Sequence, residues 1–334
     1  MTTPVVELRA RRLSNGREGL SGVYLANLKS TPESAPTEYI FKPASEEGVQ
    51  QRTEIGQPSA VKHGIVVGDA VLKERAAYLV DHCRRAGVPR VYLVVGVMQV
   101  TNGSGQVREL GALSEYVRYD CTAEDCGSTV FDVEQVHSIG LLDCRIFNLD
   151  RHEGNLLVER RPPGASKLKV SLAPIDHGFS MPSWAQLSDA FFCWSSWRQA
   201  RIPFSKDTRA YVAALDPIAD VSTLVTLGIA PECVLTYVIC STFVQVAVAD
   251  GDLTLADLAI WMQRNIAQQP GRPSALETLI NRAFHLAPFS TAALKSWRTW
   301  TTGPLATFLS AFRLLALTAM RKRKASLLAT SSCR

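Results

Sequence analysis

The sequence predicts an α+β fold of two lobes, a small β-rich N-terminal lobe over residues 1–115 and a larger, mainly helical C-terminal lobe over residues 116–330. Short apolar runs between turn-rich segments dominate the first part, whereas longer apolar-rich segments at helical spacing dominate the second. The chain has 334 residues, of which 46% are hydrophobic and 20% are charged. This composition supplies enough apolar side chains for a soluble protein with two lobes.

Two elements of the N-terminal lobe carry a charged residue in apolar surroundings. The aromatic and β-branched run Tyr39-Ile40-Phe41 predicts a strand that ends in Lys42. Residues 70–82 predict a helix that carries Glu74, and residues 91–100 predict a further strand. Turn-forming residues separate these elements, which is typical of a compact β-rich lobe.

The C-terminal lobe is expected to begin with a helix and a hairpin. Apolar residues recur at close to helical spacing over residues 133–147, which predicts a buried helix. Residues 156–160 and 168–175 predict two strands joined by a turn rich in proline and glycine. Such a hairpin would bring Asn155, before its first strand, beside Asp176, after its second. Apolar-rich segments predict further helices at residues 215–227, 232–248, 255–266, 275–286 and 305–320.

Asp150, Asn155 and Asp176 are the strongest candidates for chemistry. Asp150 and Asn155 have the D-x4-N spacing of a kinase catalytic loop, in which the aspartate accepts the substrate proton and the asparagine binds a metal. Mg²⁺ prefers carboxylate and amide oxygens and completes its shell with water and substrate phosphates. Phosphoryl transfer depends on this kind of positioning and charge neutralisation. We therefore predict a kinase that uses ATP and Mg²⁺, with Asn155 and Asp176 as the metal ligands.

Two roles are open for His152, which lies between Asp150 and Asn155. Histidine is a common general base in enzymes, so His152 could share this role with Asp150. Alternatively, it orients the loop through hydrogen bonds. We favour Asp150 as the base. Glu153 places an additional negative charge beside the loop but removes no ligand.

The order of residues in the two motifs resembles that of a particular kinase superfamily. Protein kinases usually have His-Arg-Asp and Asp-Phe-Gly, whereas this chain has Asp150-Arg151-His152 and Asp176-His177-Gly178. This inversion resembles the phosphatidylinositol 3-/4-kinase superfamily, and in particular the gamma group of type II phosphatidylinositol 4-kinases known from plants. The similarity spans about residues 16–225. Further segments that resemble this group are residues 21–24, 40–43, 67–82, 86–89 and 202–205.

The resemblance implies a two-lobed kinase-like fold and a phosphatidylinositol 4-kinase activity. It implies that Lys42 holds the α- and β-phosphates of ATP and that Glu74 pairs with this lysine. It also implies that residues 111–116 cross between the lobes near the adenine. Finally, it assigns to the phosphate-covering loop, where backbone N–H groups can approach an anion, the residues Gly16, Gly19, Ser21 and Gly22.

The acceptor of the phosphoryl group has more than one interpretation. A phosphatidylinositol kinase must bring an anionic head group to the site, yet residues 179–197 contain no lysine or arginine, and Arg198, Arg201 and Lys206 come only afterwards. A protein Ser/Thr kinase with the same fold is therefore an alternative, in which the acceptor is a protein hydroxyl. A nucleotide-binding scaffold without turnover is a further alternative, but the intact candidate residues argue against it.

The remaining features of the sequence concern partners and location. Residues 1–7 lack the apolar core of a signal peptide, and no apolar run reaches ~18 residues free of charge, so we expect a cytoplasmic protein. Residues 305–320 precede the basic run 321–324, which would suit peripheral contact with an anionic membrane. We favour the alternative that this helix packs on the larger lobe. A net charge of +5 and basic clusters without interleaved aromatic residues indicate no nucleic-acid partner.

The eight cysteines are scattered along the chain without paired C-x2-C units. This pattern indicates neither a zinc site nor a disulfide framework. We therefore expect reduced and mostly buried thiols, with Cys121 and Cys126 in a loop as exceptions.

Overall fold

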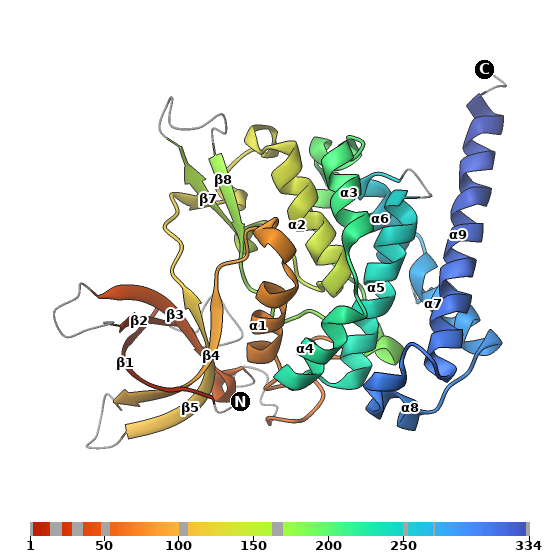
Figure 1. The fold of residues 1–334 in the computed structure, drawn as a ribbon. Coiled ribbons are helices and arrows are strands. Elements are labelled where there is room, and N and C mark those ends of the chain that lie inside the picture. The colour runs from red at the N-terminus through yellow and green to blue at the C-terminus, as the bar shows by residue number, and fades with distance from the viewer. Residues whose placement is uncertain are drawn as a thin grey trace.

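The structure is a computed structural model, and it confirms the α+β fold with a barrel of strands beside a group of helices (Figure 1). It describes residues 3–13, 22–28, 36–47, 54–99, 106–161, 170–249, 253–269 and 271–331, the last of these without the side chains of 324–331. The predictions for Gly16, Gly19 and Ser21 therefore lie outside the described residues.

The N-terminal strands form a closed barrel in the order β1-β2-β3-β5-β4, in which β1 and β4 pair in parallel. The strands are β1 (Val5–Arg12), β2 (Tyr24–Leu28), β3 (Thr37–Pro43), β4 (Val91–Gln99) and β5 (Gln106–Glu115). Phe41 is fully buried at the centre of the barrel. Its ring takes the space beside Gly96 and Gly111, and a Cβ at Gly96 would lie 2.7 Å from the ring. The barrel therefore needs glycine at both positions.

Helix α1 (Ala70–Val80) packs between the barrel and the C-terminal helices and places Glu74 at the edge of β3. Glu47 accepts hydrogen bonds from the N–H groups of Gly68 and Ala70, at 2.8 and 3.1 Å, and so holds the start of the helix. The helix ends before the predicted boundary at residue 82. Asp81 leaves the helix because its carboxylate accepts hydrogen bonds from the N–H groups of the turn at residues 86–88.

The C-terminal lobe combines a small sheet with a group of helices. Strands β6 (Cys121–Thr122), β7 (Leu156–Arg160) and β8 (Val170–Pro174) form the sheet, and the antiparallel pairing of β7 with β8 confirms the predicted hairpin. The helices are α2 (Val133–Ile146), α3 (Lys206–Ala214), α4 (Ala219–Leu227), α5 (Pro231–Ala249), α6 (Leu255–Met262), α7 (Ala275–Leu286), α8 (Thr291–Lys295) and α9 (Pro304–Ser331). They surround α5, as Figure 1 shows.

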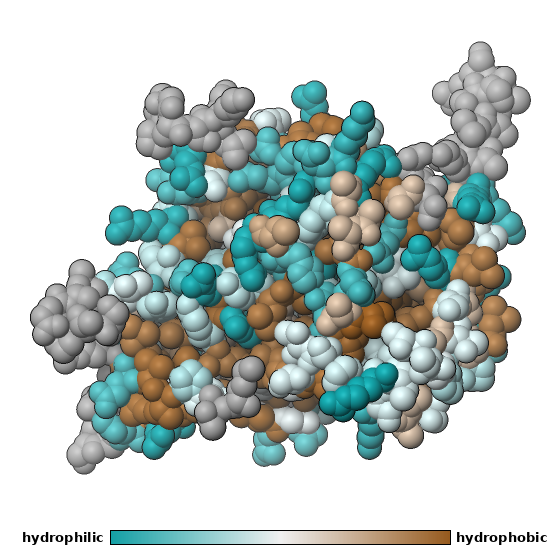
Figure 2. All heavy atoms as spheres, viewed as in Figure 1, coloured by the Kyte–Doolittle hydropathy of each residue, from teal (hydrophilic) through white to brown (hydrophobic). Residues whose placement is uncertain are grey.

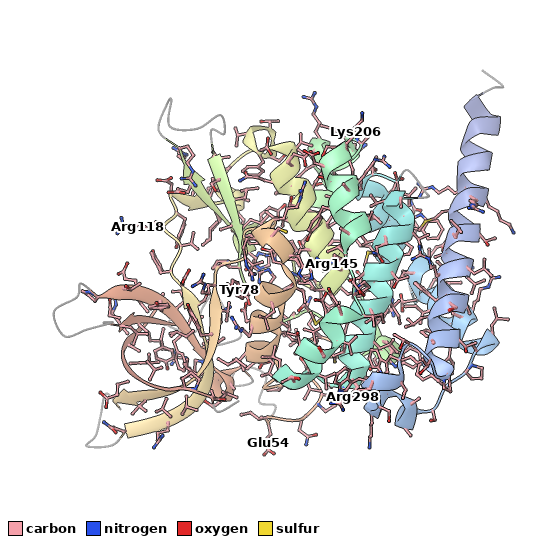
Figure 3. All side chains as sticks on the ribbon, viewed as in Figure 1. Glu54, Tyr78, Arg118, Arg145, Lys206 and Arg298 are labelled. Carbon is pink, nitrogen blue, oxygen red and sulfur yellow. The ribbon has the colours of Figure 1, made fainter. Side chains whose placement is uncertain are left out.

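Helix α5 forms the centre of the larger core. By length and composition, it is the one unbroken helix in the described parts of the chain that could cross a membrane, but 78% of its most apolar window is buried inside the protein. Arg145 of α2 links this helix to α1, because it donates to the backbone oxygen of Val80 at 3.1 Å and to the Tyr237 hydroxyl at 2.6 Å (Figure 3). The two lobes are therefore joined by a buried polar contact.

Helix α9 packs on the larger lobe against α7 and α5, as the favoured alternative predicts. Buried side chains recur along one face of it, at Leu305, Phe308, Phe312, Ala316 and Met320. Beyond this apolar face, Arg323 forms an ion pair of 2.6 Å with Asp257 of α6. The end of the helix extends past the other helices, at the upper right of Figure 1.

The surface and the cysteines agree with the composition. On the face shown in Figure 2, hydrophilic residues are spread over the upper and central part of the helices, and hydrophobic residues gather over the barrel at the lower left. The seven cysteines that the structure describes are free thiols. Four of them are buried, and Cys121 and Cys126 lie with their sulfur atoms 3.0 Å apart.

Candidate active site

Lys42 contacts two acidic residues, the expected partner Glu74 and also Asp176, whose contact with this lysine was not predicted. Its Nζ lies 2.5 Å from Glu74 Oε1 and 3.1 Å from Asp176 Oδ1. Burial alone lowers the pKa of Lys42, but the carboxylates of Asp176 and Glu74 outweigh burial and raise this pKa above its usual value. The lysine is therefore held as a cation at the boundary between the lobes.

Glu74 binds a second element through its other carboxylate oxygen. Glu74 Oε2 accepts a hydrogen bond from the backbone N–H of His177 at 3.1 Å. Burial raises the pKa of Glu74, but Lys42 and His177 outweigh burial and hold this pKa well below its usual range. One carboxylate on α1 thus positions both the lysine of β3 and the segment that carries Asp176.

The loop after α2 is held by a chain of hydrogen bonds. Helix α2 ends at Ile146, and the next residue, Phe147, has a left-handed backbone with φ 46°. Asn148 donates from Nδ2 to Asp143 Oδ1 at 2.9 Å and accepts the N–H of Asp150 at 3.0 Å. Asn155 donates from Nδ2 to the backbone oxygen of Asp150 at 3.1 Å. The positions of Asp150 and Asn155 relative to each other are therefore set by the loop itself.

Arg151 is a structural residue for which the sequence alone indicated no role. It is fully buried, and its Nε lies 3.0 Å from Asp143 Oδ2. Its Nη1 donates to the backbone oxygens of Asn155 and Ile175, at 2.8 and 2.7 Å. This guanidinium therefore ties the loop after α2 to the end of β8, just before Asp176. The signal in the sequence that could have indicated this role is the position of Arg151 inside the Asp-Arg-His motif.

The hairpin brings the two predicted metal ligands to one end of the sheet. Leu156 pairs with Pro174, and the N–H of Ile175 donates to the backbone oxygen of Asn155 at 3.0 Å. Asp176 follows with φ 57°, a left-handed conformation that aspartate tolerates better than most residues. Its side chain is 52% exposed. The strained backbone turns the carboxylate toward Lys42 and the opening between the lobes.

The donor set at Asn155 and Asp176 fits a hard divalent cation. The amide nitrogen of Asn155 is occupied by Asp150, so the amide oxygen is the atom left for a metal. Asp176 adds a half-exposed carboxylate. In the parts of the chain that the structure describes, no group of three or more His, Cys, Asp or Glu residues could hold a metal. This pair matches Mg²⁺, which binds to one or two protein groups and to phosphates.

A cavity of about 250 Å³ lies beside these residues at the boundary between the lobes. Apolar residues of β3, β5 and β7 contribute to it, including Ile40, Ala112 and Leu157, and Lys42 and Asp176 lie at its polar end. Residues 111–115 were expected to cross between the lobes, but they form the last part of β5. The crossing begins at Tyr116, which also lines the cavity. The strand continues because residues 111–115 pair with β3 through residue 39.

His152 and Gly22 lie at the margins of the site. Nδ1 of His152 accepts the N–H of Gly154 at 3.2 Å and lies 3.6 Å from Glu124 Oε1. These two contacts agree with the alternative in which His152 orients the loop through hydrogen bonds. Gly22, the one described member of the predicted phosphate-covering loop, packs against Glu46 where a Cβ would collide with its carboxylate.

Lys62 is a further charged residue at the site, and it was not among the candidates from the sequence. Its Nζ lies 3.2 Å from Asp150 Oδ1 and 3.2 Å from the backbone oxygen of Leu149. The lysine belongs to a turn-rich stretch between β3 and α1 without periodic pattern or motif, so no local signal indicated its position.

The aromatic residues after the Asp-His-Gly motif pack mostly inside the larger lobe. Phe192, Trp194 and Trp197 are buried, and the Trp194 Nε1 donates to Asp143 Oδ2 at 3.0 Å. Phe191 is exposed. The three buried aromatic side chains therefore belong to the core of the larger lobe.

A barrel with a lysine held by a helical glutamate, above a loop with Asp and Asn and a hairpin that ends in Asp, defines a kinase domain. The sequence model described as phosphatidylinositol 3- and 4-kinase matches residues 45–254 of the chain. The chain therefore belongs to the phosphatidylinositol 3- and 4-kinase family.

Plant proteins are among its relatives. The chain is 36% identical over 278 residues to phosphatidylinositol 4-kinase gamma 7 of Arabidopsis thaliana, a match that covers 78% of this chain and 42% of that protein. It is 34% identical over 283 residues to phosphatidylinositol 4-kinase gamma 4 of Oryza sativa subsp. japonica, covering 80% and 47% respectively. The chain spans about half the length of the curated relatives it matches.

Proposed function

We propose that the chain is an ATP- and Mg²⁺-dependent kinase that phosphorylates the 4-hydroxyl of phosphatidylinositol. The observation that carries the proposal is the position of Lys42, whose ammonium contacts Glu74 at 2.5 Å and Asp176 at 3.1 Å beside the cavity between the lobes. The names of the relatives support the lipid acceptor. Contact with a membrane from the cytoplasmic side belongs to the same proposal.

Each residue of the site has a defined task in this reaction. Lys42 holds the α- and β-phosphates while Glu74 limits its reach. Asn155 and Asp176 would hold Mg²⁺, which when bound neutralises negative charge on the phosphates. Asp150 accepts a hydrogen bond from the acceptor hydroxyl and takes its proton as the bond to phosphorus forms. The apolar side chains of the cavity enclose the adenine.

The acceptor is tested by a direct competition between substrates. Purified protein is incubated with Mg²⁺ and ATP labelled in the γ-phosphate, together with either phosphatidylinositol vesicles or a mixture of soluble proteins. We expect label in the lipid, at the 4-position of the inositol ring, and none with Asp176→Asn protein. Label in proteins alone would favour the alternative Ser/Thr kinase, and label in neither fraction would leave a nucleotide-binding scaffold.

Because Lys42 and Glu74 are paired, we expect the effects of substituting them on kcat/KM to be non-additive. We expect Lys42→Met to lower kcat/KM by about 10²–10³-fold, since a positioned phosphate contact is lost. Glu74→Gln should have a smaller effect, because the carboxylate acts through the lysine and the N–H of His177.

A double-mutant cycle measures whether the two residues act together. The double variant should be about as slow as Lys42→Met alone, since residues that act as one unit share their loss. A combined defect equal to the product of the two single defects would contradict the pairing as a functional unit.

A further inference from the structure

Lys62 reaches the candidate base from the opposite lobe. It belongs to the segment between β3 and α1, and its Nζ lies 3.2 Å from Asp150 Oδ1 on the loop after α2. The turn around it is held locally, because the N–H groups of Val61 and Lys62 both donate to Ser59 Oγ at 3.2 Å. The side chain is about one quarter exposed, and that of Asp150 about one third.

The same segment contacts the chain that follows the Asp-His-Gly motif. The N–H of Ser183 donates to the backbone oxygen of Gly64 at 2.8 Å, and Ser188 Oγ donates to that of His63 at 3.4 Å. A Cβ at Gly64 would collide with residues of this stretch, and its φ of 75° favours glycine. Lys62 therefore sits beside Asp150 on a turn that is held both locally and by the chain after the Asp-His-Gly motif.

Two other cations near the reaction centre, Lys42 and Arg151, are bound to other groups in the part of the chain that the structure describes. Lys42 is bound to Glu74 and Asp176 on the nucleotide side. Arg151 is fully buried against Asp143 and backbone oxygens. Among Lys42, Arg151 and Lys62, only Lys62 contacts Asp150 directly. Its side chain is also partly exposed, whereas that of Arg151 is fully buried.

We propose that Lys62 is a catalytic residue that binds the γ-phosphoryl group during its transfer, an inference that rests on the proposed kinase function. As the acceptor hydroxyl binds to Asp150, the ammonium moves from the carboxylate to the oxygens of the phosphoryl group. The acceptor O–P bond forms while the bond from phosphorus to the bridging oxygen breaks and leaves its electron pair on ADP. The hydroxyl proton goes to Asp150, and Lys62 exchanges no proton.

The Lys62 ammonium needs to move only a few ångströms from the Asp150 carboxylate to reach the phosphoryl group. A hydroxyl bound to Asp150 lies about 2.7 Å from the carboxylate, and an aligned phosphorus lies about 3–3.5 Å beyond the hydroxyl oxygen. Lys62 Nζ starts 3.2 Å from the same carboxylate. The flexible four-carbon stem of lysine can cover the remaining few ångströms. A donor placed at developing negative charge is among the strongest contributions to catalysis.

The test compares Lys62→Met with Lys295→Met, a matched change at an exposed lysine of α8 remote from the site. One readout is binding of ADP with Mg²⁺, with and without aluminium fluoride as a mimic of the phosphoryl group in transfer. The other is kcat and KM for both substrates. For Lys62→Met we expect about 10²-fold lower kcat and a similar loss of affinity for the ADP–aluminium fluoride complex. Affinity for ADP and the melting temperature should stay unchanged, and Lys62→Arg should recover part of kcat.

Three results would overturn the inference. Unchanged kcat and analogue affinity in Lys62→Met would show that the lysine has no part in transfer. A higher kcat would show that the ion pair restrains Asp150. A loss confined to the KM for the lipid would make Lys62 an acceptor-binding residue instead. Wild-type protein that labels no acceptor would overturn the proposed function itself, whereas an active wild type with an equally active Lys62→Met would overturn only this inference.

Discussion

Replacement of Asp176 by alanine is expected to abolish Mg²⁺-dependent ATP turnover, with kcat/KM lower by at least about 10³-fold. The carboxylate is both the proposed metal ligand and a partner of Lys42 at 3.1 Å, so its loss affects metal and phosphate together. A bound metal contributes several kcal/mol of charge stabilisation, and each ~1.4 kcal/mol corresponds to a factor of ten in rate. Turnover of labelled ATP measures the effect.

The fold should survive this substitution. The side chain of Asp176 is half exposed, so its removal leaves no core cavity, although alanine is disfavoured at φ 57°. Asp176→Asn is the matched control, because asparagine tolerates the left-handed backbone while the negative charge is lost. We expect both variants to be inactive and the asparagine variant to melt at the wild-type temperature. Wild-type turnover in both, with normal melting, would remove Asp176 from the metal site.

Asp150→Asn is expected to stop phosphoryl transfer to the acceptor while it preserves the binding of Mg²⁺ and ATP. General-base catalysis contributes about 10²–10⁴-fold, so kcat should fall within that range. The isosteric amide keeps the shape of the side chain, and the backbone oxygen of Asp150 still accepts the Asn155 bond. Calorimetric ATP binding and single-turnover transfer separate the two steps.

His152→Ala tests the rival base. Nδ1 of His152 accepts the N–H of Gly154 and faces Glu124, so we expect a modest loss from a less ordered loop and an unchanged pH profile. A loss as large as that of Asp150→Asn, together with a flattened pH profile near neutrality, would make His152 the base. Full transfer by Asp150→Asn to every acceptor tried would require another interpretation of the catalytic loop.

Several predictions from the sequence depend on contacts between near neighbours in the chain. The helix at 133–147 ends one residue earlier, at Ile146, and the hairpin forms as predicted between β7 and β8. Because a hairpin has fixed register, the residues that flank it must meet at one end, so Asn155 and Asp176 could be paired without a structure. The pairing of Lys42 with Glu74 came from the resemblance to a family, and their contact spans 32 positions.

The boundary of β5 could not be placed from the sequence. Residues 111–115 remain in the barrel because they pair with β3, a strand about 70 residues earlier, and this pairing carries no local period. The crossing segment therefore begins at Tyr116. The composition of α9 left two alternatives, packing on the larger lobe or peripheral contact with a membrane. The burial of its apolar face against α5 and α7 agrees with the first.

The fold class, the D-x4-N loop and the hairpin that leads to Asp176 could be predicted from the residues alone, because motif spacing and strand alternation are local properties of the chain. Only the tertiary structure placed Lys62 at Asp150, across 88 positions and between two lobes. A lysine in a turn has the same local appearance whether it faces solvent or a catalytic carboxylate. Its environment is set by how the barrel and the helices pack, and no short segment of sequence records that arrangement.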